Sequence, residues 1–232
     1  NEIQYWKNEL EGFENLELPT DFPRLEQSTG HGKTLKLQIS APQIARFTQM
    51  GETKGFSLYV YVVTAVYMLL HKYSGQSQFC IGMPVSNRND VAIEGIIGFF
   101  VNNLTIRLKE ADRKGLTVLE LLQMVQQKIV TGQDHQKIPF ERIVEEVAVQ
   151  RDQSRNPVFQ VMVNSINGMT ENDHTPDSFT FELEEVENNA AKFDLTFSLD
   201  QLADEAGYEL KLVYSNDLFT KESAERMCAT CT

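Results

Sequence analysis

Cysteine is scarce in this sequence, and its scarcity excludes one class of protein. Cys80, Cys228 and Cys231 are too few, and odd in number, for the disulfide framework of a small secreted protein. We therefore expect a reducing compartment and a cytoplasmic location. Cys228 and Cys231 form a lone C-x-x-C, and no second pair completes the four ligands of a zinc site. The pattern therefore predicts no metal.

Positive charge and long apolar runs are also in short supply in this chain of 232 residues. It has 21 Lys and Arg against 33 Asp and Glu, and its net charge of −12 argues against nucleic acid as a partner. The longest apolar run covers residues 56–70, whereas a helix that spans a bilayer needs about 20 residues. A membrane partner is therefore not expected.

Several familiar catalytic motifs are absent. The sequence has no G-x-S-x-G, no glycine-rich phosphate loop and no H-E-x-x-H, which argues against α/β-hydrolases, common nucleotide-binding folds and one class of zinc protease. His31, His71 and His174 are interpreted as surface or helix-end residues. His135 lies in a loop before a helix that begins at Pro139, and it alone is placed as a site residue often is.

Hydrophobic periodicity predicts helices and strands in mixed order. Helices are expected around Tyr5 and Trp6, from Ser40 to near Gly51, and at residues 56–72, 117–129, 139–147 and from 220 onward. The helices that begin at Ser40 and Thr117 each carry a capping box, with Gln43 and Glu120 three residues later. Strands are expected at residues 34–39, 79–85, 96–108, 158–165, 179–186, 193–200 and 208–214. Pro84 cannot donate a backbone hydrogen bond to a neighbouring strand, so we expect it at a sheet edge or strand end. This order predicts an α/β or α+β sheet layered with helices and held as one domain.

Two adjacent asparagines interrupt the apolar stretch IIGFFVNNLTIRL, residues 96–108. In a strand, alternation places Asn102 on the more apolar face with Phe100 and Leu104, and Asn103 on the other face. An unpaired amide would be costly there. One interpretation is therefore that Asn102 ties down a neighbouring loop by hydrogen bonds to its backbone.

A second polar cluster, RDQSRNP, precedes the strand expected at residues 158–165. Arg151, Asp152 and Arg155 fall within one turn. The local interpretation is that arginine and aspartate pair with each other, while Asn156 and Pro157 set the turn.

Three stretches taken together point further. IIGFFVNNLTIRL, HQKIPFERIV and RDQSRNPVFQVMV resemble, in this order, three signature motifs of the condensation domains of nonribosomal peptide synthetases. The family patterns are roughly I-G-x-F-V-N-T-x-x-x-R, H-Q-x-x-P-F-E and R-D-x-S-R-N-P. The matching residues are Ile97, Gly98, Phe100, Val101, Asn102 and Arg107; His135, Gln136, Pro139, Phe140 and Glu141; and Arg151, Asp152, Ser154, Arg155, Asn156 and Pro157. The resemblance covers essentially the whole chain.

The resemblance implies a fold like that of chloramphenicol acetyltransferase, with two similar α/β lobes and a tunnel between them. Donor and acceptor carrier domains would dock at opposite tunnel mouths and bring thioester-bound substrates on phosphopantetheine arms. The acceptor amine would attack the donor thioester and form a peptide bond. Carrier domains and neighbouring synthetase modules are the implied partners, and no cofactor is expected to bind this chain directly.

The sequence departs from the family at one important place, since it lacks the catalytic signature H-H-x-x-x-D-G. In the family this motif lies in the N-terminal lobe. We therefore expect the chain to be a C-terminal lobe, with an inter-lobe link at residues 1–34, a final helix cut short, and no condensation activity alone. The alternatives are a carrier-docking or tunnel-wall fragment without catalysis, or half of an epimerisation or heterocyclisation domain.

Site residues follow from the same resemblance. No catalytic residue is expected in this lobe. Asn102, Asn103 and Gly98 are candidates for the substrate side of the tunnel, and the other motif residues, from His135 to Pro157, are expected to be structural or tunnel-lining. If Asn102 faces the tunnel, Asn102→Ala should lower turnover more than stability. Donor and acceptor identity, stereochemical preference and module position cannot be read from the sequence.

Overall fold

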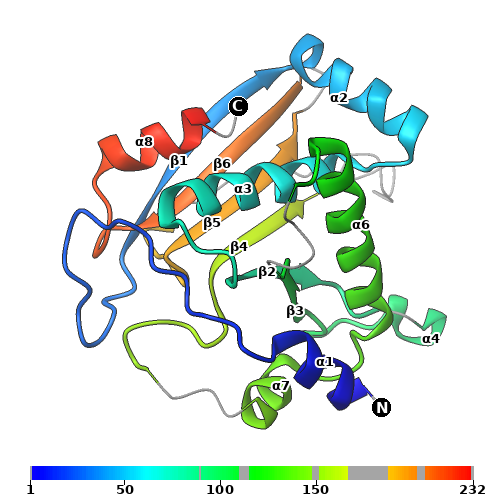
Figure 1. The fold of residues 1–232 in the computed structure, drawn as a ribbon, viewed down its shortest axis with the longest axis horizontal. Helices are drawn as coiled ribbons and strands as arrows, with labels where there is room; N and C mark the ends of the chain where they lie inside the picture. The colour runs from blue at the N-terminus through cyan, green and yellow to red at the C-terminus, as the bar shows by residue number, and fades with distance from the viewer. Residues whose placement is uncertain are drawn as a thin grey trace, which may run out of the picture.

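Six strands pair into one sheet in the order β1-β6-β5-β4-β2-β3 (Figure 1). The computed structural model describes residues 2–88, 90–109, 115–147, 152–166, 188–202 and 207–230. Neighbouring strands are antiparallel, except that β4 is parallel to both β2 and β5. The strands are β1 (Gly32–Ser40), β2 (Cys80–Val85), β3 (Asn102–Arg107), β4 (Phe159–Ile166), β5 (Leu195–Gln201) and β6 (Gly207–Ser215).

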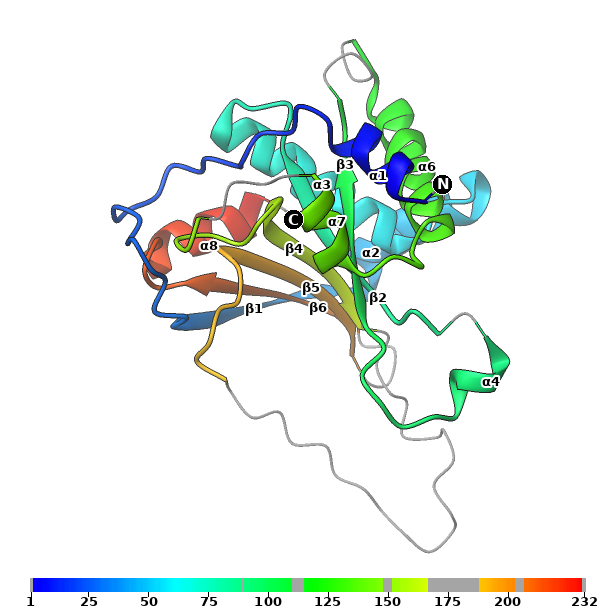
Figure 2. The same ribbon diagram turned by 90° about the horizontal axis from the view of Figure 1, so that it is seen from below.

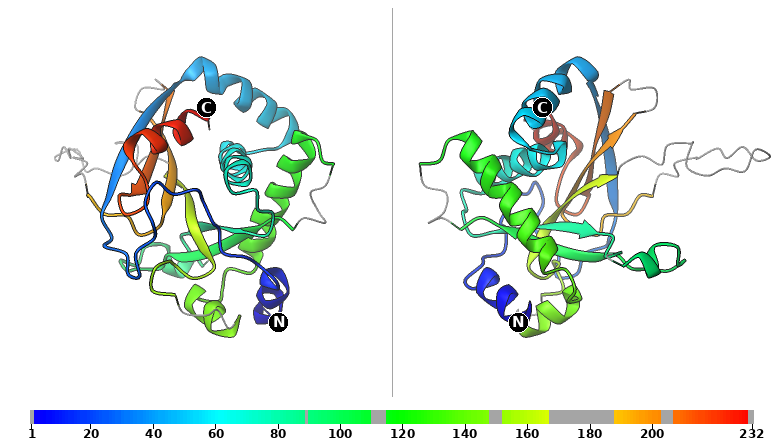
Figure 3. Two further views of the ribbon diagram at one scale, coloured as in Figure 1. Left: turned by 60° about the vertical axis from the view of Figure 1, so that its left-hand side comes forward. Right: turned by 90° about the vertical axis from the view of Figure 1, so that its right-hand side faces the viewer.

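Helices cover one face of this sheet. The right-hand view of Figure 3 shows α2, α3 and α6 on one side of the strands, whereas α4 projects beyond the other side. The described helices are α1 (Glu2–Leu10), α2 (Ala41–Lys54), α3 (Leu58–Ser74), α4 (Val91–Glu94), α6 (Val118–Asp134), α7 (Phe140–Glu146) and α8 (Lys221–Thr230). No single helix in these ranges is long and apolar enough to cross a membrane. Helices α2 and α3, which are bent by 111° relative to each other, together have the length and composition of a broken membrane span.

Both predicted capping boxes are confirmed. The Ser40 backbone N–H donates to the Gln43 side chain at 3.0 Å, and the Thr117 N–H donates to the Glu120 carboxylate at 2.8 Å. Each bond satisfies a donor that the first turn of a helix leaves free. These caps begin α2 and α6 at the positions expected from the sequence.

The hydrophobic core lies between the sheet and its helices. Phe197 of β5 and Leu212 of β6 are register partners and are fully buried. Val63 and Leu70 of α3 belong to the same apolar cluster. The long apolar run is therefore a core helix, as predicted.

Three predicted strand features have different outcomes. The strand expected at residues 96–108 begins only at Asn102, so its first part was predicted wrongly: residues 96–101 lie outside the sheet. The strand expected at residues 179–186 lies outside the described residues. Pro84 was expected at a sheet edge or strand end. It pairs with Asn103 of β3, and the β4 ladder stops at Gly82, so Pro84 lies at the strand end.

Candidate functional site

The first and second sequence motifs meet through the side chain of Asn102. Its amide nitrogen donates to the backbone carbonyls of Gln136 and Ile138, at 2.9 and 2.8 Å. Its amide oxygen accepts from the N–H of Phe140 at 3.0 Å and of Asn103 at 2.9 Å. The buried amide is therefore fully paired, which confirms the interpretation that Asn102 ties down a loop. Its role at a tunnel stays a prediction.

His135, from the same loop, is held by helix α1. The Trp6 indole N–H donates to the His135 carbonyl at 3.0 Å, and Tyr5 stacks on the imidazole with 3.9 Å between ring centroids. The His135 Nδ1 atom lies 3.0 Å from a Glu2 carboxylate oxygen. Burial raises the pKa of Tyr5 to about 12, with smaller contributions from the charges of Glu9 and Asp134. These contacts join α1 to the second motif.

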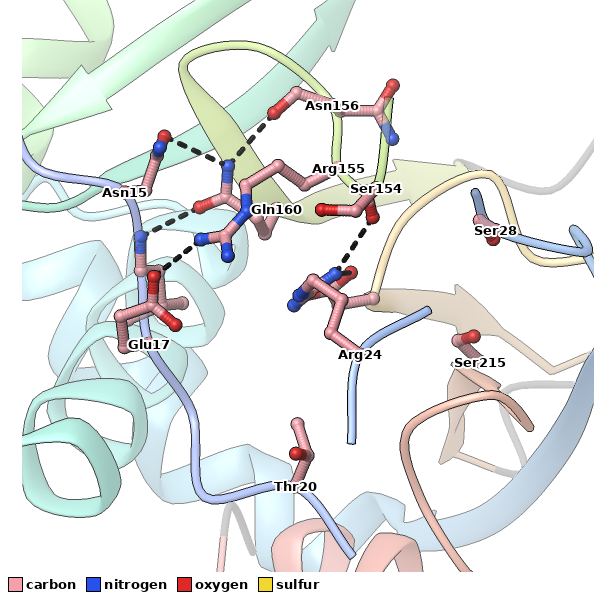
Figure 4. A network of polar contacts seen from close by, with 12 residues as sticks. Asn15, Glu17, Thr20, Arg24, Ser28, Ser154, Arg155, Asn156, Gln160 and Ser215 are labelled. Carbon is pink, nitrogen blue, oxygen red and sulfur yellow. Dashed lines mark hydrogen bonds and ion pairs between the residues drawn. The ribbon is translucent and has the colours of Figure 1, made fainter. Parts of the chain in front are cut away.

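The third motif fastens the segment of residues 13–28, which we call the strap (Figure 4). The Arg155 guanidinium lies 2.5 Å from the Glu17 carboxylate of the strap and 3.0 Å from Asp152, so the predicted local pairing is confirmed for these two residues. Hydrogen bonds from Ser154 hold the pKa of Asp152 below its usual value. Arg151 lies outside the described residues.

Two further contacts complete this attachment. The Arg24 guanidinium binds both carboxylate oxygens of Asp194 and donates to the Ser154 carbonyl at 3.1 Å. Burial alone would lower the pKa of Arg24, but the hydrogen bond and charge of Asp194 outweigh it and raise that pKa. The Gln160 side chain accepts from Leu16 N–H at 2.8 Å. Arg24, Ser154 and Asp194 help to line a polar cavity of about 140 Å³.

Backbone strain follows the third motif directly. Val158 has φ of 70°, a left-handed conformation that is a true outlier for a β-branched residue, and its side chain is fully buried. The pairing of β4 with β2 then shifts register, since Phe159 opposes Cys80 while Val161 opposes Ile81. The left-handed backbone of Val158 and the register shift therefore both lie at the point where the third motif passes into β4.

All three motifs line one cavity of about 380 Å³, which we call the motif cavity. Its walls come from β3, from α7, from the end of the third motif and from the turn before β5. The lining residues are Asn103, Phe140, Glu141, Val144, Glu145, Asn156, Pro157, Phe159 and Phe193. Candidates far apart in the sequence are thus brought together, and Asn103 is the one tunnel candidate that faces this space.

Gly98, the remaining tunnel candidate, lies on a projecting segment of residues 91–101, which we call the apolar arm (Figure 2). Arg88 holds the arm by donating to the carbonyls of four residues: Ile93 at 2.6 Å, Glu94 at 3.2 Å, Ile96 at 2.9 Å and Gly98 at 3.3 Å. Its guanidinium also lies 4.4 Å from the centre of the Phe100 ring. The arm's exposed large apolar residues are Val91, Ile96, Ile97, Phe99 and Val101.

Sequence reasoning missed several residues that shape the site. Arg88, Val158 and Gln160 are not among the residues that match the family patterns, and one partner of Gln160, Leu16, lies 144 residues away in the chain. Arg107 belonged to a motif, but its contacts could not be foreseen. Its buried guanidinium donates to the carbonyls of Glu9, Glu11 and Gly12 and to Gln78, and so fixes the end of α1.

The site offers recognition surfaces but little reactive chemistry of its own. Within the described ranges, no group of three His, Cys, Asp or Glu side chains could hold a metal ion. Burial raises the pKa of the Cys80 thiol to about 12, so it stays protonated and inert near neutral pH. Hydrogen bonds and aromatic walls are what the arrangement provides.

Comparison with known proteins gives a consistent result. The family model described as "Condensation domain" matches residues 1–232. Tyrocidine synthase 3 of Brevibacillus parabrevis is 34% identical over 225 residues, which are 97% of this chain and 3% of that protein. Surfactin synthase subunit 1 of Bacillus subtilis (strain 168) is 34% identical over 224 residues, 96% of this chain and 6% of that protein. The chain thus spans a small part of each curated relative.

Solved structures agree in fold. A four-domain nonribosomal peptide synthetase bound to AMP and glycine has a TM-score of 0.86 at 25% identity, covering 98% of this chain and 18% of that one. The X-domain from teicoplanin biosynthesis has a TM-score of 0.85 at 28% identity, and the match covers 99% of this chain and 53% of that one. The X-domain has also been solved in complex with OxyB. That structure has a TM-score of 0.84 at 27% identity, and the match covers 99% of this chain and 51% of that one. This chain therefore matches about half of the X-domain.

Proposed function

Because this chain belongs to the condensation-domain family, we propose that it is one lobe of a two-lobed enzyme that joins a donor thioester to an acceptor amine. The family match over residues 1–232 is the observation that carries the proposal. In the reaction, the amine nitrogen attacks the thioester carbonyl carbon. An amide bond forms, the carbon–sulfur bond breaks, and the proton lost by the amine balances the departing thiolate.

The apolar arm supports a second lobe. Phe99 is 90% exposed and Ile97 is fully exposed, although both belong to a segment that Arg88 holds in one conformation. Large apolar side chains on an ordered projection mark an interaction surface. The arm lies on the side of the sheet that α2, α3 and α6 leave uncovered (Figure 3). We assign this side to the contact with the N-terminal lobe.

The chemistry divides between the two lobes. An amine that attacks a thioester must lose a proton, and negative charge develops on the carbonyl oxygen. This sequence has no adjacent histidine pair, so the group that handles the proton belongs to the other lobe. The present lobe supplies one wall of the tunnel, polar groups that orient the reactants, and a docking surface.

The partners follow from the same proposal. Substrates arrive as thioesters on the phosphopantetheine arms of a donor and an acceptor carrier domain, and the product leaves on the acceptor arm. The chain itself holds no cofactor in this scheme. Neighbouring synthetase modules in a cytoplasmic assembly line complete the setting, in keeping with the similarity to tyrocidine and surfactin synthases.

An assay with loaded carriers tests the proposal. The intact two-lobed domain of the parent protein and the 232-residue chain alone are each mixed with a donor-loaded and an acceptor-loaded carrier domain. We expect mass spectrometry to show a dipeptidyl acceptor carrier with the two-lobed domain and none with the single lobe. Absence of product from the two-lobed domain, with both carriers fully loaded, contradicts peptide-bond formation.

A second candidate function is a binding platform without catalysis. The similarity to an X-domain, a protein that has been solved in complex with OxyB, favours this candidate. The loaded-carrier assay separates the two functions. A platform binds its protein partner in a pull-down with the two-lobed domain and leaves both carriers unchanged, whereas a condensing enzyme transfers the donor group.

A further inference from the structure

The motif cavity has aromatic walls in a fixed arrangement. Phe159 packs between Phe140 and Phe193, with ring centroids 5.1 and 5.4 Å away. Phe140 and Phe159 are buried, while Phe193 is partly exposed. The strained backbone of Val158 precedes Phe159 directly and fixes where its ring enters the cavity. Such a wall suits a ligand that presents apolar atoms or a positive charge to aromatic rings.

Two polar side chains in the cavity have unused bonding capacity. Neither the Glu141 carboxylate nor the Asn103 side-chain amide makes a hydrogen bond or ion pair with any residue in the described part of the chain. Asn156, by contrast, uses its amide nitrogen to bind the Lys192 carbonyl. The free groups are therefore a carboxylate and an amide, placed against the aromatic wall.

The other acids of α7 show that Glu141 is exceptional on its helix. Arg142 pairs with Glu145 at 2.8 Å and with Glu146 at 3.0 Å. Lys7 also binds Glu146 at 2.8 Å, and the hydrogen bond from Lys7 lowers the pKa of that carboxyl group. Glu145 lines the same cavity but is already neutralised. Glu141 is thus the acid of α7 left for a ligand.

We propose that the motif cavity binds an organic ammonium group, the amino group of a building block handled by this domain. Among the described residues, the lining includes two carboxylates, of which Glu145 is paired with Arg142, and no lysine or arginine, so an anionic ligand is disfavoured. A carboxylate next to aromatic faces attracts an ammonium ion by charge and by cation–π interaction. The Asn103 amide oxygen accepts a further N–H bond.

The identity of the ammonium group rests on the proposed function. An aminoacyl acceptor carries an α-amino group, and some building blocks carry a second amino group on the side chain. Both share the chemistry that the cavity recognises. The cavity volume of about 380 Å³ admits a group of amino-acid size. Binding to the single lobe can be measured without any turnover, which separates this inference from peptide-bond formation.

Titration with three small amides tests the inference. Leucine amide carries an α-ammonium group, N-acetyl-lysine amide carries only a side-chain ammonium, and N-acetyl-leucine amide carries none. We expect at least one of the two ammonium compounds to shift the backbone NMR signals of Asn103 and Glu141 in the ¹⁵N-labelled 232-residue chain, and the compound that binds identifies the source. N-acetyl-leucine amide should leave these signals in place. Equal binding of all three amides, or none, overturns the proposal.

Matched variants sharpen the result. Glu141→Gln should weaken binding of the ammonium compound about fourfold, the order of one solvent-exposed charge pair, because Glu141 is exposed. Glu145→Gln, which removes an acid from the same cavity, should change it less than about twofold because Arg142 already pairs with that acid. Thermal unfolding checks that each variant is folded. Unchanged binding in a folded Glu141→Gln protein overturns the proposal.

The two hypotheses can fail separately. Ammonium binding that depends on Glu141, together with an inactive two-lobed domain, supports the site and contradicts the proposed function. Normal dipeptide formation together with no ammonium binding contradicts the site alone. The assays therefore assign a failure to one hypothesis or the other.

Discussion

The apolar arm and strand β3 are neighbours in one sequence motif but differ in environment. Ile97 and Phe99 of the arm face solvent, whereas Leu104 and Ile106 of β3 are almost fully buried. Their sequences are similarly apolar. An apolar sequence therefore predicts a buried surface, but it does not predict which element buries it. The covering element can belong to the same chain or to another part of the protein.

Polar contacts separate the two regions as clearly as burial does. Asn102 and Arg107 lie at the two ends of β3. Asn102 binds backbone carbonyls of the α6–α7 loop, and Arg107 binds those of the last turn of α1 and of the residues that follow it. The arm is held by Arg88, which donates to its backbone carbonyls and lies over the ring of Phe100. We therefore expect mutations in β3 to affect the whole fold and mutations in the arm to act locally.

The largest expected effect comes from Arg107→Ala. The substitution leaves the carbonyls of Glu9, Glu11 and Gly12 without their buried partner, and we expect it to lower the free energy of unfolding by about 3–5 kcal/mol. Urea denaturation followed by circular dichroism measures this loss. A loss below about 1 kcal/mol would show that water replaces the guanidinium and that β3 is not anchored as described.

The adjacent asparagines provide the next test. Asn102→Ala removes four hydrogen bonds inside the fold and should cost about 2–3 kcal/mol, whereas Asn103→Ala should cost less than about 0.5 kcal/mol. Melting temperatures of the two variants make the comparison. Similar losses in both would contradict the distinct roles of the two side chains. Reduced turnover per folded Asn102→Ala molecule in the two-lobed domain would support its predicted role at the tunnel.

Arg88→Ala should loosen the arm without unfolding the domain. Loss of four carbonyl contacts should increase the rate of proteolytic cleavage within residues 91–101 about tenfold, while global stability changes by less than about 1 kcal/mol. Limited proteolysis with mass spectrometry locates the cut. An unchanged cleavage rate would mean that the arm holds its shape without Arg88.

Phe99→Ser should have the smallest effect on the chain alone. Its ring is 90% exposed, so we expect a change within about 0.5 kcal/mol in the free energy of unfolding. In the two-lobed domain the same substitution should lower the melting temperature by several degrees, because a buried interface loses an aromatic ring. Equal effects in both proteins would contradict an interface at this side chain.

Much of the fold could be predicted from periodicity and capping signals. Ser40 with Gln43 and Thr117 with Glu120 marked helix starts because both partners are close in sequence. The tie made by Asn102 was foreseen because a polar residue on an apolar strand face needs bonds. The start of β3 was missed, since periodicity does not distinguish an apolar strand from an apolar arm whose covering surface is elsewhere.

The candidate site was less predictable. The motifs named most of its residues, but the meeting of Asn103, Glu141 and Asn156 depends on tertiary structure. Arg24 and Asp194 are 170 residues apart, and their pairing left no local signal. The left-handed Val158 was also hidden, because a valine gives no sequence cue for positive φ.

Hydrogen–deuterium exchange of residues 91–101 tests the central claim most directly, that the arm is one side of a contact between two lobes. The exchange is measured in the 232-residue chain and in the intact two-lobed domain of the parent protein. We expect fast exchange in the chain alone and strong protection in the two-lobed domain. Equally fast exchange in both proteins would contradict the claim.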